Sequence, residues 1–384
     1  MAQDVQDPRK GREPEHGSCI LFFSGGTALR GVSRELSYHT HNSVHIITPY
    51  DSGGSSAVLR KAFAMPAVGD IRNRLMALAD LSEKGGREIF ALFTYRLSKK
   101  DSQDLLVNEL RRMAEGEHVL ISLVPENKRT VIQDHFHRFL SAMPDGFDLR
   151  GASIGNIVLT AGYLTHRRHL APVIDLFSKL ARVRGVVRPV VDADLHLAAE
   201  LADGSVVVGQ HRLTGKEVQP LTSKIVRVWQ TGSLDSADPV AAVLDEDVRQ
   251  AIARADLICY PVGSFYTSVV ANLLPDGVGA AVAANPCAKV FVPNPGGDPE
   301  LLDHSVIEQV ALLRRYLVQS GASQGESVLS HVVVDSRAEY PGGLDTRALE
   351  ALGVVVVDAA LMTEESRPCF DPVLLVSVLL SLSD

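Results

Sequence analysis

The sequence has few cysteines, no long apolar run and no excess of positive charge, and each shortage excludes a class of protein. Its 384 residues include four cysteines, none in a Cys-x-x-Cys pair, so neither a disulfide framework nor a zinc knuckle is expected. No apolar run approaches the ~20 residues that a membrane span needs. The formal net charge of −8 disfavours binding to nucleic-acid phosphates or anionic membranes. We therefore predict a reducing, cytoplasmic setting, with no nucleic-acid partner and no membrane.

What the chain does have is apolar content, 46% of its residues, which is enough for a large buried core. Short apolar segments alternate with segments of helical period. Several of these segments are near-continuous Val/Ile/Leu runs, which is typical of parallel strands buried on both faces. The pattern predicts a Rossmann-like α/β fold with a doubly wound, mostly parallel sheet. The predicted strands are Cys19–Ser24, Val44–Thr48, His118–Val124, Ser205–Val208, Ile225–Val228, Asp256–Pro261, Lys289–Pro293, His331–Asp335 and Val354–Asp358.

Charge and composition also suggest how the chain is organised. Residues 1–17 carry seven charges and no apolar stretch, which predicts a disordered tail without a secretory signal. No linker divides residues 18–384, so we expect one α/β domain. Within it, residues 98–150 are more charged and are expected to form a helical insertion or cap over the core sheet. Residues 198–215 predict a hairpin around an Asp-Gly turn, forming a small β extension.

The first candidate site is a glycine loop. Ser24-Gly25-Gly26-Thr27 follows a predicted strand and precedes a predicted helix over residues 28–38. Glycines allow a ligand to approach the backbone, and free N–H groups at a helix start attract an anion. The loop matches neither the dinucleotide fingerprint nor a Walker loop. A tight strand–helix turn without a ligand is the alternative interpretation.

A second polar loop follows the next predicted strand. It contains Asp51, Ser52, Gly53, Gly54 and Ser55. Parallel strands place such loops at the carboxyl edge of the sheet, where α/β proteins bind ligands. Asp51 is a candidate for holding a ribose hydroxyl, a metal ion or a substrate proton. The alternative is a polar surface loop.

The third candidate is the start of a predicted helix over residues 70–80. Asp70 is expected to be its N-cap, which places Arg72 and Asn73 in the first turn. An arginine there is unfavourable for the helix dipole. Pairing with a phosphate or with Asp51 would explain it, and a solvated arginine is the alternative.

Two later glycine positions complete the set. Gly151 to Gly155 has the letters of a nucleophile elbow, but no buried strand precedes it, so the hydrolase interpretation is rejected. We instead expect Gly155 and Asn156 to open a helix toward the same crevice. Gly263 and Ser264 follow a further predicted strand and form another candidate phosphate or ribose site.

Taken together, these loops resemble the family of 2-phospho-L-lactate transferases (CofD) and the related gluconeogenesis factors (YvcK-like), and are closer to the second branch. The main matching segment is GGSSAVLRKAFAMPAVGDIRNRLMALAD, which ends at Asp80. Supporting matches are SGGT at Ser24, LFTYRL at Leu92, GNIVLTA at Gly155, RGVVRPV at Arg184, ADLICYPVGSFYTSVVANLL at Ala255 and VFVPNP at Val290.

The resemblance implies a Rossmann-like core that binds a nucleoside diphosphate group. Its transferase branch uses magnesium to move a phospho-hydroxyacid from a nucleotide-activated donor onto a deazaflavin hydroxyl, whereas its regulator branch binds nucleotide-sugars. This sequence departs from the family pattern in three places. Ser52 replaces a second aspartate, Ala152 replaces the histidine of Gly-His-Ser, and Pro261-Val262 replaces the start of Gly-Pro-Gly-Ser.

Two functions follow as hypotheses. In a transferase, Asp51 would bind Mg²⁺ or take the proton, and Arg72 would neutralise the diphosphate. In a regulatory protein, the same loops would bind a nucleotide or nucleotide-sugar without chemistry. A third, weaker hypothesis is a partner-dependent subunit with a degenerate site. The sequence does not decide between a monomer and a homodimer. The other expected ligand contacts are Gly25, Gly26, Thr27, Ser52, Gly53, Gly54, Ser55, Asp70, Asn73, Gly155, Asn156, Gly263 and Ser264.

Overall fold

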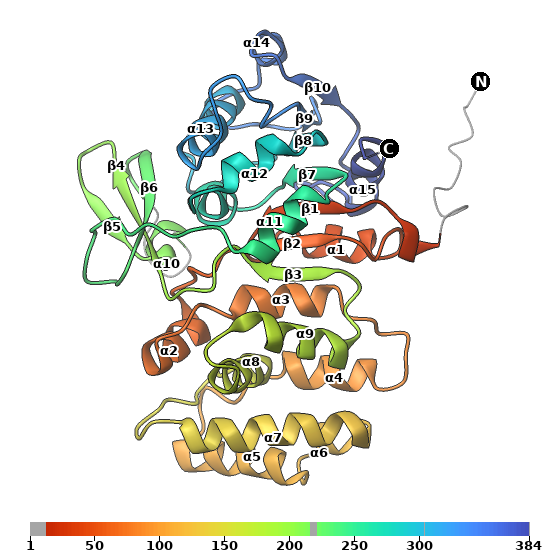
Figure 1. The fold of residues 1–384 in the computed structure, drawn as a ribbon, viewed down its shortest axis with the longest axis vertical. Coiled ribbons are helices and arrows are strands. Elements are labelled where there is room, and N and C mark those ends of the chain that lie inside the picture. The colour runs from red at the N-terminus through yellow and green to blue at the C-terminus, as the bar shows by residue number, and fades with distance from the viewer. Residues whose placement is uncertain (1–12, 216–220, 303, 384) are drawn as a thin grey trace.

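The structure, a computed structural model, describes residues 13–215, 221–302 and 304–383 and is built around a seven-stranded sheet (Figure 1). The strand order is β10-β9-β8-β7-β1-β2-β3, and every pair is parallel. The predicted doubly wound α/β fold is confirmed. The strands are β1 (Ile20–Ser24), β2 (Val44–Ile47), β3 (Val186–Pro189), β7 (Leu257–Tyr260), β8 (Ala288–Phe291), β9 (His331–Val334) and β10 (Val355–Asp358).

Helices cover both faces of this sheet because the chain winds in two directions. Crossovers from β1 to β2 and from β7 to β8 run opposite ways, so right-handed connections place their helices on opposite faces. The central strands β1, β2 and β7 are therefore buried along their whole length. One row of helices is α11 (Glu246–Ala253), α12 (Val278–Ala284) and α13 (Val306–Gln319), and the other pair is α1 (Arg30–Leu36) and α15 (Pro372–Ser381).

A helical region extends the molecule past the β3 edge of the sheet (Figure 1). Helices α3 and α9 contact β3, α4 and α8 pack behind them, and α5 and α7 lie outermost. No helix in residues 13–215, 221–302 and 304–383 has the length and apolarity needed to cross a bilayer. The bounds are α2 (Gly54–Phe63), α3 (Gly69–Ala77), α4 (Gly86–Thr94), α5 (Gln103–Glu115), α6 (Val119–Ser122), α7 (Glu126–Ala142), α8 (Ile154–Thr165) and α9 (Leu170–Ala181).

The segment 98–150 is helical, but it packs on α8 rather than over the sheet. The strand predicted at His118–Val124 is wrong, because this stretch contains the short helix α6. Its apolar residues are not buried on two faces: Ile121 is buried, whereas Val119 and Leu123 are exposed. The His118 ring caps the helix by accepting a hydrogen bond from the Leu120 amide at 3.2 Å.

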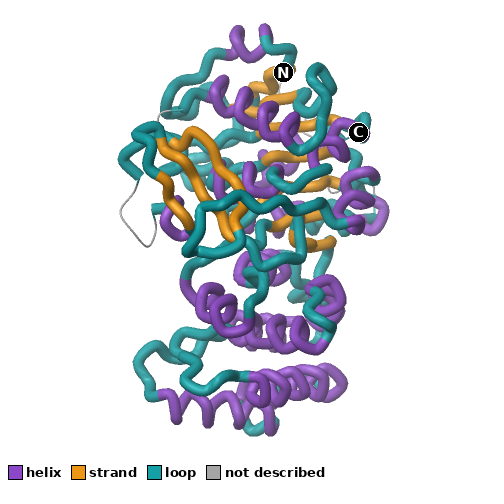
Figure 2. Tube along the Cα trace, turned by 60° about the vertical axis from the view of Figure 1, so that its left-hand side comes forward, coloured by secondary structure: helices purple, strands orange, loops and turns teal. Residues whose placement is uncertain are grey.

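A small antiparallel sheet projects from the side of the core (Figure 2). The predicted hairpin is confirmed, with a turn in which the Ser205 amide donates to Asp203 Oδ1 at 2.9 Å. The strand predicted from Ile225 also belongs here and not to the large sheet. Its exposed Arg227 shows why, since one face of this strand meets solvent. The elements are β4 (His196–Leu201), β5 (Val206–Val208), β6 (Ile225–Thr231) and the short helix α10 (Gln210–Leu213).

Two features differ from the sequence-based expectation. Strand β3 was not predicted, because an edge strand of Val-Val-Arg-Pro has no long apolar run. Residues 1–12 of the predicted tail lie outside the described residues. Ordered structure begins before Ser18, since Pro14–His16 form a 3₁₀ turn and the Pro14 carbonyl accepts a hydrogen bond from the His41 amide at 2.8 Å.

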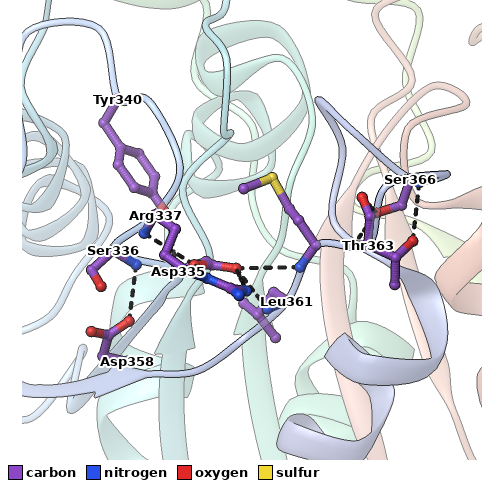
Figure 3. A network of polar contacts seen from close by, with 9 residues as sticks. Asp335, Ser336, Arg337, Tyr340, Asp358, Leu361, Thr363 and Ser366 are labelled. Atoms are coloured by element: carbon purple, nitrogen blue, oxygen red, sulfur yellow. Dashed lines mark hydrogen bonds and ion pairs between the residues drawn. The ribbon is translucent and has the colours of Figure 1, made fainter.

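Asp335, which directly follows β9, is bonded both to Arg337 in its own loop and to Leu361 in the segment after β10 (Figure 3). Its carboxylate accepts hydrogen bonds from the Arg337 guanidinium at 2.7 and 2.8 Å and from the Leu361 amide at 2.8 Å. These bonds, led by Arg337, hold the pKa of Asp335 well below its ordinary value. The carboxylate thus fixes the chain between β10 and α15.

Replacing Asp335 with alanine is expected to lower the free energy of unfolding by about 2–3 kcal/mol at pH 7. The depressed pKa means that this stability is present above the unfolded-state pKa of about 3.9 and is lost as pH falls through the folded-state value. Urea unfolding at pH 7 and pH 3 measures both effects. Asp358→Ala, which removes one exposed carboxylate bonded to the Ser336 amide, is the control and should cost under about 1 kcal/mol. Equal costs for the two variants would contradict the role of Asp335.

Candidate functional site

A cavity of about 270 Å³ lies at the carboxyl ends of β1, β2 and β7. Strands β1 and β7 are neighbours, yet the chain leaves β1 toward β2 and leaves β7 toward β8. The loops therefore diverge at this point, which is where doubly wound sheets hold ligands. The residues lining the cavity are Gly25, Gly26, Thr27, Ala28, Asp51, Gly53, Asp70, Gln210, His211, Thr214, Gly263, Ser264 and Ser268.

The structure brings eight of the predicted site residues together around this cavity and places seven elsewhere. Those that line it come from the four loops after β1, β2, β7 and at the start of α3: Gly25, Gly26, Thr27, Asp51, Gly53, Asp70, Gly263 and Ser264. Those outside its lining are Ser52, Gly54, Ser55, Arg72, Asn73, Gly155 and Asn156.

The loop after β1 is tightly packed, and its amides are partly satisfied by protein. A side chain on Gly25 would place Cβ 2.9 Å from the Ser268 hydroxyl and 3.1 Å from the Thr48 hydroxyl. Gly26 adopts φ +36°, which favours glycine, and its amide donates to Asp70 Oδ2 at 2.8 Å. The helix begins only at Arg30. The predicted amide donor of Gly26 is thus already bonded to a carboxylate.

Asp70 is not an N-cap, contrary to the sequence-based prediction. Helix α3 begins at Gly69, and Val68 occupies the cap position without a side-chain hydrogen bond. Asp70 therefore lies within the first turn, and its side chain reaches across to the first glycine loop. The carboxylate orders that loop and presents a negative charge to the cavity.

Asp51 supplies a second carboxylate to the same cavity. Its Oδ1 accepts a hydrogen bond from the Gly53 amide at 3.0 Å, a local turn that precedes α2. A Cβ on Gly69 would lie 3.4 Å from Asp51 Oδ2, so this carboxylate sits directly beside the start of α3. Among the described residues lining the cavity there is no lysine or arginine. The cavity therefore carries two acidic groups and no fixed cation from that set.

Ser52 does not line the cavity itself but is bonded to a residue of its wall. Its hydroxyl lies 2.7 Å from His211 Nδ1 and accepts a hydrogen bond from the His211 amide at 3.3 Å. This link fixes α10, which contributes Gln210, His211 and Thr214 to the lining. Sequence reasoning missed these three residues, because a lone histidine after a short strand carries no motif.

The loop after β7 is organised by carboxylates rather than left open for an anion. Asp298 Oδ2 accepts the Phe265 amide at 2.6 Å. Glu300 Oε2 accepts the amides of Tyr266 and Thr267, both at 2.9 Å. These amides open a π-helical turn (Phe265–Val269) followed by a 3₁₀ turn (Val270–Leu273). The amides of Phe265, Tyr266 and Thr267 at the start of this turn are therefore bonded to carboxylates that the sequence analysis did not identify.

Gly263 and Ser264 still line the cavity at the start of this loop. The Gly263 amide donates to Asn294 Oδ1 at 2.8 Å, and its φ of +140° requires glycine. Asn294, from the loop after β8, therefore fixes the turn that brings Ser264 to the cavity.

The start of α8 serves packing and does not line the cavity. A Cβ on Gly155 would lie 2.6 Å from the Phe93 carbonyl oxygen and 2.9 Å from Arg72 Cδ. The missing side chain therefore makes room for the Arg72 stem. Asn156 Nδ2 lies 3.5 Å from the Ser55 hydroxyl, and its buried Oδ1 has no hydrogen-bond partner among the described residues. Gly155 and Asn156 thus support the neighbouring helices.

Arg72 and Asn73 line a different cavity of about 390 Å³, next to the first. The two cavities share Gly26 and Thr27. The prediction placed Arg72 against a diphosphate or Asp51, whereas the structure separates it from the acidic cavity by the first glycine loop. Burial, followed by the nearby Arg96 charge, lowers the pKa of Arg72 to about 10.

The strand order and the helices on both faces define a Rossmann-like protein of the doubly wound α/β class, in which the switch point is the usual place for a ligand. The chain belongs to the family described as 2-phospho-L-lactate transferase CofD, whose sequence model matches residues 20–372. This confirms the family indicated by the loop motifs.

Curated relatives carry the name of the second branch. The chain is 28% identical to the gluconeogenesis factor of Bacillus subtilis over 352 residues, which is 90% of this chain and 91% of that protein. It is 29% identical to a putative gluconeogenesis factor of Nostoc over 360 residues, or 91% of this chain, and spans 64% of that longer protein.

A solved structure supports the same fold. A UPF0052 family protein from Bacillus halodurans superposes with a TM-score of 0.69 at 23% identity, over 96% of this chain and 100% of that one.

Proposed function

We propose that the acidic cavity binds the diphosphate of a nucleotide-activated donor, and that the protein transfers a phospho-hydroxyacid-type group from it to a hydroxyl acceptor. The observation that carries this proposal is the meeting of three glycine loops and two aspartates at one switch point. At Gly26 an added Cβ would meet no atom within 4 Å, so this glycine leaves room for a phosphate to approach the backbone. The family match supports the transferase class.

The charges around this cavity favour a divalent cation as part of the bound state. A diphosphate beside the carboxylates of Asp51 and Asp70 would be repelled without one. In the described ranges no cluster of three His, Cys, Asp or Glu side chains could hold a metal alone. Mg²⁺ typically binds through one or two carboxylates together with substrate phosphates, so this donor set fits it. When bound, the ion would neutralise charge on the diphosphate.

The residues of the chain would then position the reactants and move one proton. The acceptor hydroxyl oxygen forms a bond to the phosphorus that carries the hydroxyacid. The P–O bond of the diphosphate bridge breaks, and the nucleoside monophosphate leaves. Asp51, whose carboxylate lies beside Gly53 in the cavity wall, takes the hydroxyl proton. Such catalysis consists mainly of positioning and charge neutralisation.

One observation favours a second function, binding of a nucleotide-sugar by a non-catalytic regulatory protein. Ser52 stands where the family pattern has a second aspartate, and its hydroxyl is bonded to His211. A serine in this role fixes a wall of the cavity and offers no carboxylate for a metal. The relatives named gluconeogenesis factors are consistent with this function.

Calorimetry with nucleoside diphosphates and UDP-sugars, with and without Mg²⁺, tests the proposal. Binding that requires Mg²⁺, together with nucleoside monophosphate release from a nucleotide-activated phospho-hydroxyacid when a hydroxyl acceptor is added, supports the transferase. Binding without any product supports the regulatory protein. No binding of any nucleotide contradicts both and leaves the degenerate subunit.

Asp51→Asn separates binding from chemistry. At saturating Mg²⁺ we expect turnover to fall about 10²–10⁴-fold, the range for loss of a general base, while nucleotide still binds. Asn retains the oxygen that accepts the Gly53 amide, so the loop should keep its shape. Asp134→Asn, an equal charge change on the remote helix α7, is the matched control. Unchanged turnover in Asp51→Asn would refute the proton-accepting role.

A further inference from the structure

We propose that the second cavity, on the other side of the Gly26–Thr27 loop, binds an anionic group of a second small ligand, a phosphate or a carboxylate. This site goes beyond the proposed diphosphate site and does not depend on it. Four arginines line the cavity: Arg30, Arg72, Arg74 and Arg96. No acidic side chain is among its described lining residues. A guanidinium cluster without lining carboxylates matches the planar, multiple hydrogen-bonding needs of an oxyanion.

Arg72 is the strongest evidence that this cavity is a built site. Its side chain is only 5% exposed, yet Nε is buried and has no hydrogen-bond partner among the described residues. Leaving a buried charged donor unsatisfied is costly unless a ligand supplies the acceptor. The fold also makes room for it, because Gly155 lacks the side chain that would collide with the Arg72 stem.

The other three arginines differ in their hydrogen-bond partners and in their exposure. Arg74 is fully buried and donates to Ser33, Ser24 and the Gly25 carbonyl, so it supports the first glycine loop. Arg96 is exposed and donates to the Gly151 carbonyl at 3.1 Å. Arg30 is exposed at the start of α1. Arg72 and Arg30 are therefore the residues to vary.

The remaining wall of this cavity favours a ligand with an apolar part beside its anionic group. Met76, Ala77 and Phe90 supply an apolar surface beside the guanidinium groups. Apolar walls lower the local dielectric and strengthen attraction between a guanidinium and an oxyanion. We infer a small metabolite with an anionic head and a less polar body. Since Gly26 and Thr27 line both cavities, such a ligand would lie next to the one in the acidic cavity.

The test uses the full chain, with inorganic phosphate and acetate as separate probes of the two kinds of anion. Wild-type affinity is measured by calorimetry and compared with Arg72→Gln, Arg30→Gln and Arg34→Gln. Arg34 is the matched control, since it is exposed on the same helix one turn from Arg30 and lines neither cavity. We expect affinity to fall about tenfold in the first two variants, or about 1.4 kcal/mol, and less than twofold in Arg34→Gln.

A stability measurement adds a readout that a purely structural role would not give. The melting temperature of Arg72→Gln without anion should be equal to or higher than that of wild type, because the substitution removes a buried Nε donor that has no hydrogen-bond partner among the described residues. Added phosphate or acetate should then raise the melting temperature of wild type but not of the variant. A large loss of stability in Arg72→Gln would contradict the inference.

Two further outcomes would overturn it. One is failure of both probes to bind, or an equal loss in Arg34→Gln. The other is disappearance of anion binding when a nucleotide saturates the acidic cavity, which would place the arginines in the nucleotide site. Retained binding under saturation supports a separate site. If no nucleotide binds at all, the diphosphate proposal fails while the anion titration remains decisive for this cavity.

Discussion

Replacing Glu300 with alanine should lower the free energy of unfolding by about 3–5 kcal/mol, because three buried donors would lose their acceptor at about 1–3 kcal/mol each. Glu300 is 1% exposed. It accepts the amides of Tyr266 and Thr267 and the Thr267 hydroxyl. No other part of the loop replaces these bonds, so the wall around Ser264 should lose order and nucleotide binding should weaken. Urea unfolding and calorimetry measure the two effects.

Glu300→Gln is the matched variant, since its amide keeps an oxygen for the two backbone donors. Burial, followed by the Asp298 charge, raises the pKa of Glu300. The folded state then holds the proton more tightly than the unfolded chain. Wild-type stability is fully present below the unfolded-state pKa of about 4.3 and is lost as pH rises toward the folded-state value. Because glutamine does not titrate, Glu300→Gln should remove this dependence of stability on pH.

We therefore expect Glu300→Gln to stay within about 1 kcal/mol of wild type at pH 7 and to be at least as stable under alkaline conditions. A cost below about 1 kcal/mol for alanine would show that the loop does not depend on this carboxylate. A cost for glutamine equal to that for alanine would show that the glutamine amide does not replace Glu300 as the acceptor of these hydrogen bonds.

The second large effect is expected at the contact between α12 and α13. A Cβ on Gly279 would lie 1.7 Å from the Leu317 carbonyl oxygen and 3.0 Å from the Ala322 amide nitrogen. Both are backbone atoms, so the clash can be relieved only by moving one helix away from the other. Gly279→Ala should therefore cost about 3 kcal/mol or more, the upper range for overpacking. Denaturant unfolding followed by circular dichroism measures this loss.

Gly232→Ala is the matched glycine control. Its nearest neighbour would be Val240 Cγ2 at 3.6 Å, an ordinary contact, and its backbone needs no positive φ. Alanine there should leave stability unchanged or increase it by about 0.4–1 kcal/mol, since the unfolded chain loses freedom. Similar effects at Gly279 and Gly232 would contradict the close helix contact.

The position of the candidate site was predictable from sequence because local signals mark it. Apolar runs end at Ser24 and Tyr260, with glycines directly after the first and three residues after the second, and parallel strands bring such ends to one edge. Asp51 was predicted as a site residue because it lies in the loop after the next strand, β2. The prediction of a strand at His118–Val124 was wrong because a short apolar run does not show whether its residues are buried on one face or on two.

The chemistry of each loop could not be predicted, because the acceptors lie far along the chain. Gly26 donates to a carboxylate 44 residues away, and the Phe265 amide to one 33 residues away. Ser52 meets His211 across 159 residues. No local sequence pattern predicts hydrogen bonds between residues this far apart.

The order of residues was thus enough to specify the class of fold, the family and the edge of the sheet where a ligand would lie, since periodicity and turn residues act over a few neighbours. Folding in three dimensions determined which loop amides are bonded to carboxylates, that Arg72 lines a second cavity, and that α10 lines the first. Those outcomes depend on which acceptors from distant segments reach a given buried donor. The reason is that a buried polar group needs a hydrogen-bond partner, either from the protein or from a ligand.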